Sequence, residues 1–187
     1  NFNTAKDKKE YIDLDSWFDT NKPLYLEIGC GKGKFACEYA AMNPDINFLA
    51  VEKSANVIVE ACEKAKEAGL KNLKFIKCGA EYLEKYIKPK SIERIFLNFS
   101  CPFPKKAYAT HRLTHLRFLG VYKRIMTDNA EIHQKTDNMH FFEFSLEEYS
   151  AASYTIQQLF LDLHHIGFAV NLVTAYEKLC SDLGHVI

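Results

Sequence analysis

Apolar positions along the chain occur in two alternating patterns. Short apolar runs bounded by turn residues are typical of strands buried on both faces, whereas apolar residues at every third or fourth position are typical of helices. The short runs predict strands over 23–29, 46–52, 73–78, 91–99 and 130–136. The helical spacing predicts helices over 34–44, 55–69, 81–87, 111–126 and 138–149.

This alternation of strand and helix predicts the α/β class. Strands joined through helices form a parallel sheet with right-handed crossovers. We therefore expect a doubly wound, mostly parallel sheet with helices on both faces. The last third is less regular, and its pattern predicts a strand over 154–164, a loop over 165–171 and a closing helix over 175–184. Because there are no repeats or linkers, we expect one domain over 1–187, with 1–22 as an N-terminal extension that could be truncated.

Composition is that of an ordinary globular protein. The 187 residues are 48% hydrophobic and 26% charged, and a chain of this length buries roughly 70% of its unfolded surface. No apolar run approaches the roughly 20 residues that a membrane span needs, and the first residues lack the apolar core of a signal peptide. We therefore expect a cytoplasmic protein without a membrane partner. The chain begins with Asn rather than Met, so further residues can precede it.

Charge and cysteine usage narrow the possible partners. Lys and Arg number 24 against 24 Asp and Glu, so binding to nucleic acid would have to rest on a local basic patch. The six cysteines, at 30, 37, 62, 78, 101 and 180, are dispersed and form no C-x-x-C pair. This spacing argues against both a disulfide framework and a zinc site. We expect no metal, and we expect most of the cysteines to be small buried apolar residues.

A glycine-rich loop follows the first predicted strand and opens the first predicted helix. Its glycines, Gly29, Gly31 and Gly33, allow a tight turn and the close approach of a ligand to the backbone. The G-x-G-x-G spacing differs from the dinucleotide pattern G-x-G-x-x-G. Glu52 ends the next strand about 20 residues on, where a carboxylate can accept hydrogen bonds from ribose hydroxyls. A plain turn and a solvated strand end are the alternatives, but the two features together favour a nucleoside site.

Two later strands also end in unusual loops. Asn-Phe-Ser-Cys-Pro-Phe-Pro-Lys-Lys (98–106) follows the fourth strand, and its two prolines predict a rigid loop. Lys-Thr-Asp-Asn (135–138) follows the fifth strand. Because ligands of parallel sheets bind outside the carboxyl ends of the strands, we expect both loops to line one site. Asp137 could accept hydrogen bonds from a guanine edge; alternatively, it is a helix N-terminal residue stabilised by the helix dipole.

Taken in order, these segments resemble the bacterial tRNA (guanine-N7-)-methyltransferase family. The resemblance runs from about Pro23 to the C-terminus through LEIGCGKG, NPDINFLAVE, N-F-S-x-P-x-P-K-K, R-L-T-H, K-T-D-N and T-x-Y-E. It implies a Rossmann-like class I methyltransferase fold, S-adenosylmethionine as cofactor and methylation of guanine N7 in the variable loop of tRNA. It leaves open whether the protein is a monomer or a homodimer.

The resemblance also implies roles for individual residues. Cofactor contacts are implied for Glu27, Gly29, Gly31, Gly33, Glu52, Gly79, Ala80 and Cys101. Substrate contacts are implied for Lys105, Arg112, Asp137, Thr174, Ala175, Tyr176 and Glu177. Cys101 and Asp137 stand at the catalytic positions. Lysines such as Lys105 are otherwise usually solvated surface residues.

Several of these positions depart from the family pattern. Cys101 stands where the family has its catalytic Asp, and Phe103 replaces a Trp. Gly79 replaces an acid at the adenine end, although Glu81 lies two positions on. The dense basic stretch that meets tRNA is reduced to Arg112. These losses keep two alternatives open: a diverged, weakly active or inactive paralogue that binds cofactor or RNA without turnover, and a methyltransferase with another substrate.

Overall fold

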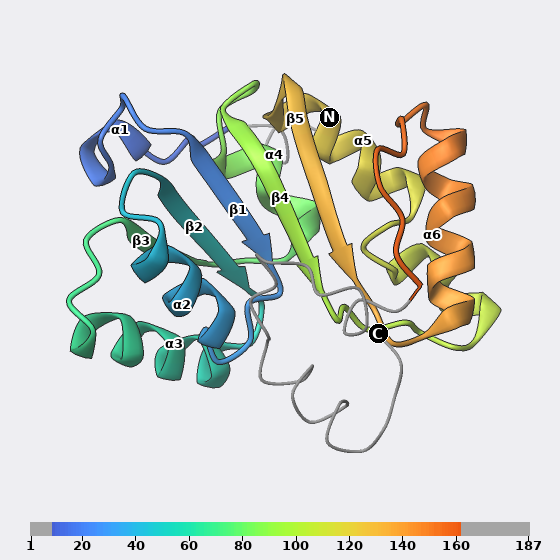
Figure 1. The fold of residues 1–187 in the computed structure, drawn as a ribbon, viewed down its shortest axis with the longest axis horizontal. Helices are drawn as coiled ribbons and strands as arrows, with labels where there is room; N and C mark the ends of the chain where they lie inside the picture. Colours follow the sequence, from blue (N-terminus) through green and yellow to red (C-terminus); the bar gives the residue numbers. More distant parts are fainter. Residues whose placement is uncertain (1–8, 162–187) are drawn as a thin grey trace, which may run out of the picture.

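A parallel five-stranded sheet forms the centre of the protein (Figure 1). The computed structural model describes residues 9–161, and the strand order in this part of the chain is β3-β2-β1-β4-β5. The strands are β1 (Leu24–Ile28), β2 (Asn47–Glu52), β3 (Leu73–Lys77), β4 (Ile92–Asn98) and β5 (Met126–Lys135). All four strand pairs are parallel, so their carboxyl ends lie at one edge.

The strand order reverses at β1, which defines where a ligand can bind. From β1 the chain proceeds outward to β2 and β3 on one side, then returns to place β4 and β5 on the other. The register aligns Leu26 of β1 with Leu49 of β2 and with Ile95 of β4. In open sheets of this kind the crevice lies outside the carboxyl ends of the strands at the reversal, here next to Ile28 and Asn98.

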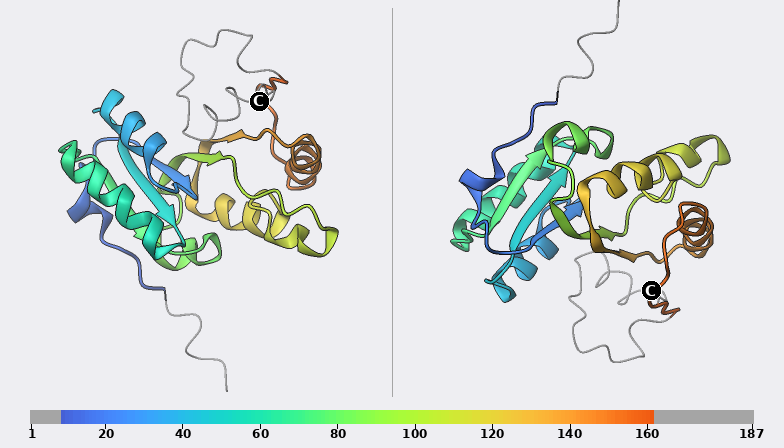
Figure 2. Two further views of the ribbon diagram at one scale, coloured as in Figure 1. Left: turned by 90° about the horizontal axis from the view of Figure 1, so that it is seen from below. Right: turned by 90° about the horizontal axis from the view of Figure 1, so that it is seen from above.

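Helices cover both faces of the sheet, as Figure 2 shows from below and above. The helices α2 (Lys34–Met42) and α3 (Ala55–Glu67) lie on one face. On the other face lie α1 (Leu14–Trp17), α4 (Leu83–Tyr86) and α5 (Leu116–Ile125), with α6 (Met139–Ala151) beside α5. Two short 3₁₀ helices, η1 (Ala80–Tyr82) and η2 (Lys106–His111), follow β3 and the proline-containing loop.

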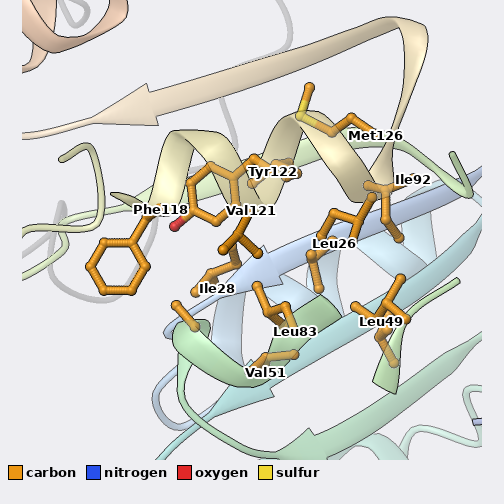
Figure 3. Close-up of a cluster of buried hydrophobic side chains, with 14 of the residues drawn as sticks. Leu26, Ile28, Leu49, Val51, Leu83, Ile92, Phe118, Val121, Tyr122 and Met126 are labelled. Atoms are coloured by element: carbon orange, nitrogen blue, oxygen red, sulfur yellow. The ribbon is translucent and has the colours of Figure 1, made fainter. Parts of the chain in front are cut away.

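Each face of the sheet has its own apolar core, because successive strand residues point to opposite faces. Aliphatic residues such as Leu26 and Leu49 pack against α4 and α5 on one face (Figure 3). The other core is aromatic: the Phe96 ring lies 5.1 Å from Phe35 of α2 and 5.9 Å from Phe48 of β2, centroid to centroid. Burying each of these side chains contributes roughly 1.5–3 kcal/mol to folding, so the sheet edge that carries the loops has rigid support.

The structure confirms the five predicted strands and most of the predicted helices, with shifted ends. The helix predicted over 111–126 begins only at Leu116, because His115 is its N-cap and accepts a hydrogen bond from the Arg117 backbone at 3.2 Å. The segment preceding it is η2 rather than α-helix. No helix in the described residues is long and apolar enough to cross a membrane.

Two predictions are wrong. Residues 154–161 form no strand. The chain turns at Ser153 with φ of 56°, the Tyr154 hydroxyl donates to the Leu119 carbonyl of α5 at 3.2 Å, and residues 155–159 are exposed. Of the five cysteines in the described part of the chain, only Cys30 is buried; Cys37 and Cys78 are half-buried against the two cores, and Cys62 and Cys101 are exposed on a helix and a loop. The loop and helix predicted over 165–171 and 175–184 lie outside the described residues.

Candidate active site

The three glycines after β1 all take left-handed backbone conformations, with φ of 82°, 55° and 73° at Gly29, Gly31 and Gly33. Such angles favour glycine. A Cβ at Gly33 would lie 2.6 Å from the Ala61 Cβ of α3, so this glycine also permits close helix packing. A Cβ at Gly29 or Gly31 would meet nothing within 4 Å. The space over the first two glycines is therefore open to a ligand.

Glu52 links this loop to the end of β2. Its Oε2 accepts a hydrogen bond from the Gly31 backbone N–H at 3.2 Å, and its Oε1 accepts one from the Ser54 backbone N–H at 2.9 Å. Each carboxylate oxygen has two lone pairs, so the group retains acceptor capacity. The structure thus fixes the carboxylate beside the glycine loop, where the sequence placed a ribose contact.

Glu27 lies beneath the loop and is buried in β1, with 2% of its surface exposed. Its Oε1 accepts a hydrogen bond from Asn98 Nδ2 of β4 at 3.0 Å, whereas its Oε2 is buried with no partner among the described residues. Burial raises the pKa of this carboxyl to about 7, although the Asn98 hydrogen bond opposes the shift. An orphaned buried oxygen is costly; a cationic or donor group of a ligand would satisfy it.

Glu81 supplies an acidic side chain at the end of β3, although residue 79 is glycine. Gly79 has an ordinary φ of −83°, so the backbone does not require glycine there. A Cβ at this position would lie 2.5 Å from Glu81 Oε2, because the Glu81 carboxylate packs back over Gly79. Burial and, to a lesser extent, the Glu81 charge raise the pKa of the neighbouring Cys78 thiol to about 11. Ala80 is buried and begins η1.

The proline-containing loop after β4 is held in an unusual backbone conformation. Phe99 and Phe103 have φ of 49° and 42°, in the left-handed region that bulky residues rarely adopt. The Phe99 backbone N–H donates to the Lys135 carbonyl at 2.9 Å, which joins the ends of β4 and β5. Cys101 and Lys105 are exposed on this loop, where they can meet a substrate.

Arg112 is turned toward this loop. Its Nε donates to the Pro102 carbonyl at 2.9 Å, and one terminal nitrogen donates to the Phe103 carbonyl at 3.0 Å. The guanidinium carbon lies 4.3 Å from the centroid of the Phe144 ring of α6. The side chain for which the resemblance implies a substrate contact therefore contacts its own chain.

Asp137 lies between β5 and α6, at the same edge of the sheet. The N-cap of α6 is Asn138, whose Oδ1 accepts a hydrogen bond from the Phe141 backbone N–H at 2.9 Å. The capping function thus belongs to the following residue, and Asp137 is half-buried beside it.

The structure brings most of the expected residues together at the carboxyl ends of the five strands. The expected substrate residues Thr174, Ala175, Tyr176 and Glu177 lie outside the described residues. The sequence indicates Asn98 only as the first residue of the N-F-S-x-P-x-P-K-K segment, with no role of its own, and Phe144 only as an apolar residue of a half-buried helix. Within residues 9–161, no cluster of His, Cys, Asp or Glu side chains could hold a metal ion.

Solved structures with a similar fold are methyltransferases. A solved antibiotic-related methyltransferase aligns with a TM-score of 0.64 at 15% identity, covering 89% of this chain and 83% of that structure. A SAM-dependent methyltransferase from Aquifex aeolicus aligns with a TM-score of 0.57 at 18% identity, covering 76% and 82%. The fold is therefore that of a Rossmann-like class I methyltransferase.

Sequence comparison then gives the family. The family model described as "Putative methyltransferase" matches residues 21–187. A tRNA (guanine-N(7)-)-methyltransferase of Staphylococcus epidermidis is 42% identical over 187 residues, covering 96% of this chain and 87% of the relative. One from Streptococcus suis is 41% identical over 170 residues, covering 91% and 80%. The chain belongs to the tRNA (guanine-N(7)-)-methyltransferase family.

Proposed function

We propose that the protein transfers the methyl group of S-adenosylmethionine to N7 of a guanine in the variable loop of cytoplasmic tRNA. Family membership supports the reaction, and one observation in the structure carries the placement of the cofactor. This is the buried, unpartnered Oε2 of Glu27 beneath the open glycine loop. Buried polar atoms in folded proteins nearly always have a hydrogen-bond partner, so an unpartnered oxygen here supports a ligand site at this edge of the sheet.

The residues present fit this cofactor. The ammonium group of its amino-acid part would satisfy Glu27, and Gly29 and Gly31 leave room above the backbone. Glu52 has the free lone pairs that ribose hydroxyls require, and Glu81 places a carboxylate at the end of β3 for the adenine amino group. When bound, the cofactor supplies an electrophilic methyl group on a sulfonium.

Methylation at N7 does not require the protein to remove a proton from the base. Guanine N7 is a lone-pair acceptor without a hydrogen, so no general base is needed. The protein's contribution is to hold the guanine in line, where orientation can supply roughly 7–11 kcal/mol. Asp137 would accept hydrogen bonds from the N1–H and amino group of the base, while Lys105 would contact phosphate.

With Cys101 in place of a carboxylate, the site stabilises the transition state of methyl transfer less well. A thiol accepts hydrogen bonds poorly and does not offset the positive charge that develops on the methylated base. Losing one preorganised electrostatic contact typically lowers kcat by about 10²–10³. We therefore propose a slow enzyme.

The test is transfer of label from methyl-tritiated S-adenosylmethionine to an unmodified tRNA transcript. We expect label in 7-methylguanosine after digestion to nucleosides. The matched control is the same transcript made with 7-deazaguanosine, which lacks N7 and should take up no label. Absence of label from the normal transcript, or equal labelling of both, would refute the proposed reaction.

A further inference from the structure

The loop between β4 and η2 needs an external support to keep its shape. Phe99 and Phe103 both have positive φ, and strained backbone of this kind persists only where surrounding contacts over-determine it. The loop also carries Cys101 and Lys105, which are exposed and which the proposed function assigns to the reaction. A small change in its backbone would therefore displace side chains that the reaction depends on.

Arg112 provides contacts suited to that support. It donates hydrogen bonds to two successive loop carbonyls, those of Pro102 and Phe103, at 2.9 and 3.0 Å. The planar guanidinium presents several donors in a fixed fork, a geometry that the single ammonium of lysine cannot reproduce. Phe144 of α6 lies against the guanidinium at 4.3 Å, and an aromatic face attracts a cation.

The segment that carries Arg112 is itself anchored in the interior. Thr114, two residues on, is fully buried, and its Oγ1 shares a 2.9 Å hydrogen bond with Ser145 Oγ of α6. The Leu113 carbonyl accepts a hydrogen bond from the Tyr122 hydroxyl of α5 at 3.0 Å. The guanidinium therefore connects the loop to a segment that is fixed against α5 and α6.

We infer that Arg112 is a positioning residue: its guanidinium, backed by Phe144, holds the loop that carries Cys101 and Lys105 in its reactive shape, and it does not bind tRNA phosphate. The inference rests on the proposed function. It differs from the role that the family resemblance implies, which is a contact with the substrate. Both roles need a positive charge at position 112, so the experiment must separate charge from geometry.

Steady-state kinetics of Arg112→Ala and Arg112→Lys at several salt concentrations make this separation. We expect both variants to lose kcat to a similar extent, on the order of 10²-fold, and any change in KM for tRNA to be the same in the two variants. A lost phosphate contact would instead raise KM and reduce the slope of log KM against log salt by about 0.7–0.9. Lysine would restore such a contact. The control is Arg117→Ala, which removes an exposed arginine from α5 and should preserve kcat.

A double-mutant cycle tests the partner. If Phe144 acts through Arg112, Phe144→Leu lowers kcat in the wild type but has little further effect in Arg112→Ala. Additive effects of the two changes would overturn the coupling. Recovery of kcat in Arg112→Lys, or a reduced salt slope in Arg112→Ala with kcat intact, would overturn the positioning role.

Amide hydrogen exchange at the non-proline residues of 99–105 provides a measurement that needs no activity. We expect faster exchange in Arg112→Ala and Arg112→Lys than in the wild type and Arg117→Ala, with unchanged exchange in β1 and β2. Equal exchange in all four proteins would contradict the inference. If the wild type methylates no tRNA but the loop still loosens, the proposed function fails while the structural role of Arg112 stands.

Discussion

Replacing Glu27 by Gln tests whether the site contains a buried carboxylate that awaits a ligand. Glu27 is 2% exposed, and burial raises the pKa of its carboxyl from 4.5 to about 7. Above pH 7 the folded protein without ligand therefore holds a buried charge whose Oε2 has no partner among the described residues. Gln has nearly the same shape, keeps an acceptor for Asn98 and carries no charge.

The pKa difference sets the size of the expected effect. Two to three pKa units correspond to about 3 kcal/mol. Because the folded-state pKa is the higher one, the contribution of Glu27 to stability is fully present below pH 4.5 and is lost as pH rises through about 7. Between pH 5.5 and 9 the wild type should lose about 2 kcal/mol relative to Glu27→Gln.

Urea denaturation at pH 5.5, 7 and 9 measures this difference. The control is Glu67→Gln, which neutralises an exposed carboxylate on α3. Its free energy of unfolding should change with pH as that of the wild type does. S-adenosylhomocysteine should stabilise the wild type more than Glu27→Gln, because only the carboxylate pairs with its ammonium group. A stability difference between Glu27→Gln and wild type that does not change with pH would refute the reasoning.

Three further substitutions test the surrounding loops. Gly33→Ala should lower the free energy of unfolding by about 2–4 kcal/mol in urea denaturation, because φ is 73° and the new Cβ would meet Ala61 at 2.6 Å. Gly79→Ala should stay within about 1 kcal/mol of the wild type in the same assay, since φ is ordinary and the flexible Glu81 side chain can move; a loss as large as that of Gly33→Ala would contradict this. Cys101→Asp should raise the initial rate of tRNA methylation by up to about 10²-fold. An unchanged rate would contradict the proposal that the thiol slows the reaction.

The sheet could be predicted because its strands are buried on both faces and their apolar runs stand out. The glycine loop and Glu52 could be placed because they are tied to strand ends by short-range geometry. Residues 154–161 could not be predicted, because an alternating pattern forms a strand only where another strand offers hydrogen bonds. Here Tyr154 is held by the Leu119 carbonyl of α5, a contact between segments far apart in the sequence.

The details of the site depend on similar long-range contacts. The partnership of Glu27 with Asn98 joins two strands 71 positions apart in the chain. For Arg112 the family resemblance implies a substrate contact, whereas the direction of its side chain is set by two carbonyls of the neighbouring loop and by Phe144 of α6. Sequence indicated which residues gather at the edge of the sheet, whereas side-chain direction depended on the folded neighbours.

A crystal structure of the protein with S-adenosylhomocysteine tests the central claim most directly. We expect the ligand's ammonium group within hydrogen-bond distance of Glu27 Oε2 and its ribose hydroxyls on the Glu52 carboxylate, above Gly29 and Gly31. A ligand bound elsewhere, or one that leaves the Glu27 oxygen without a partner, would contradict the account.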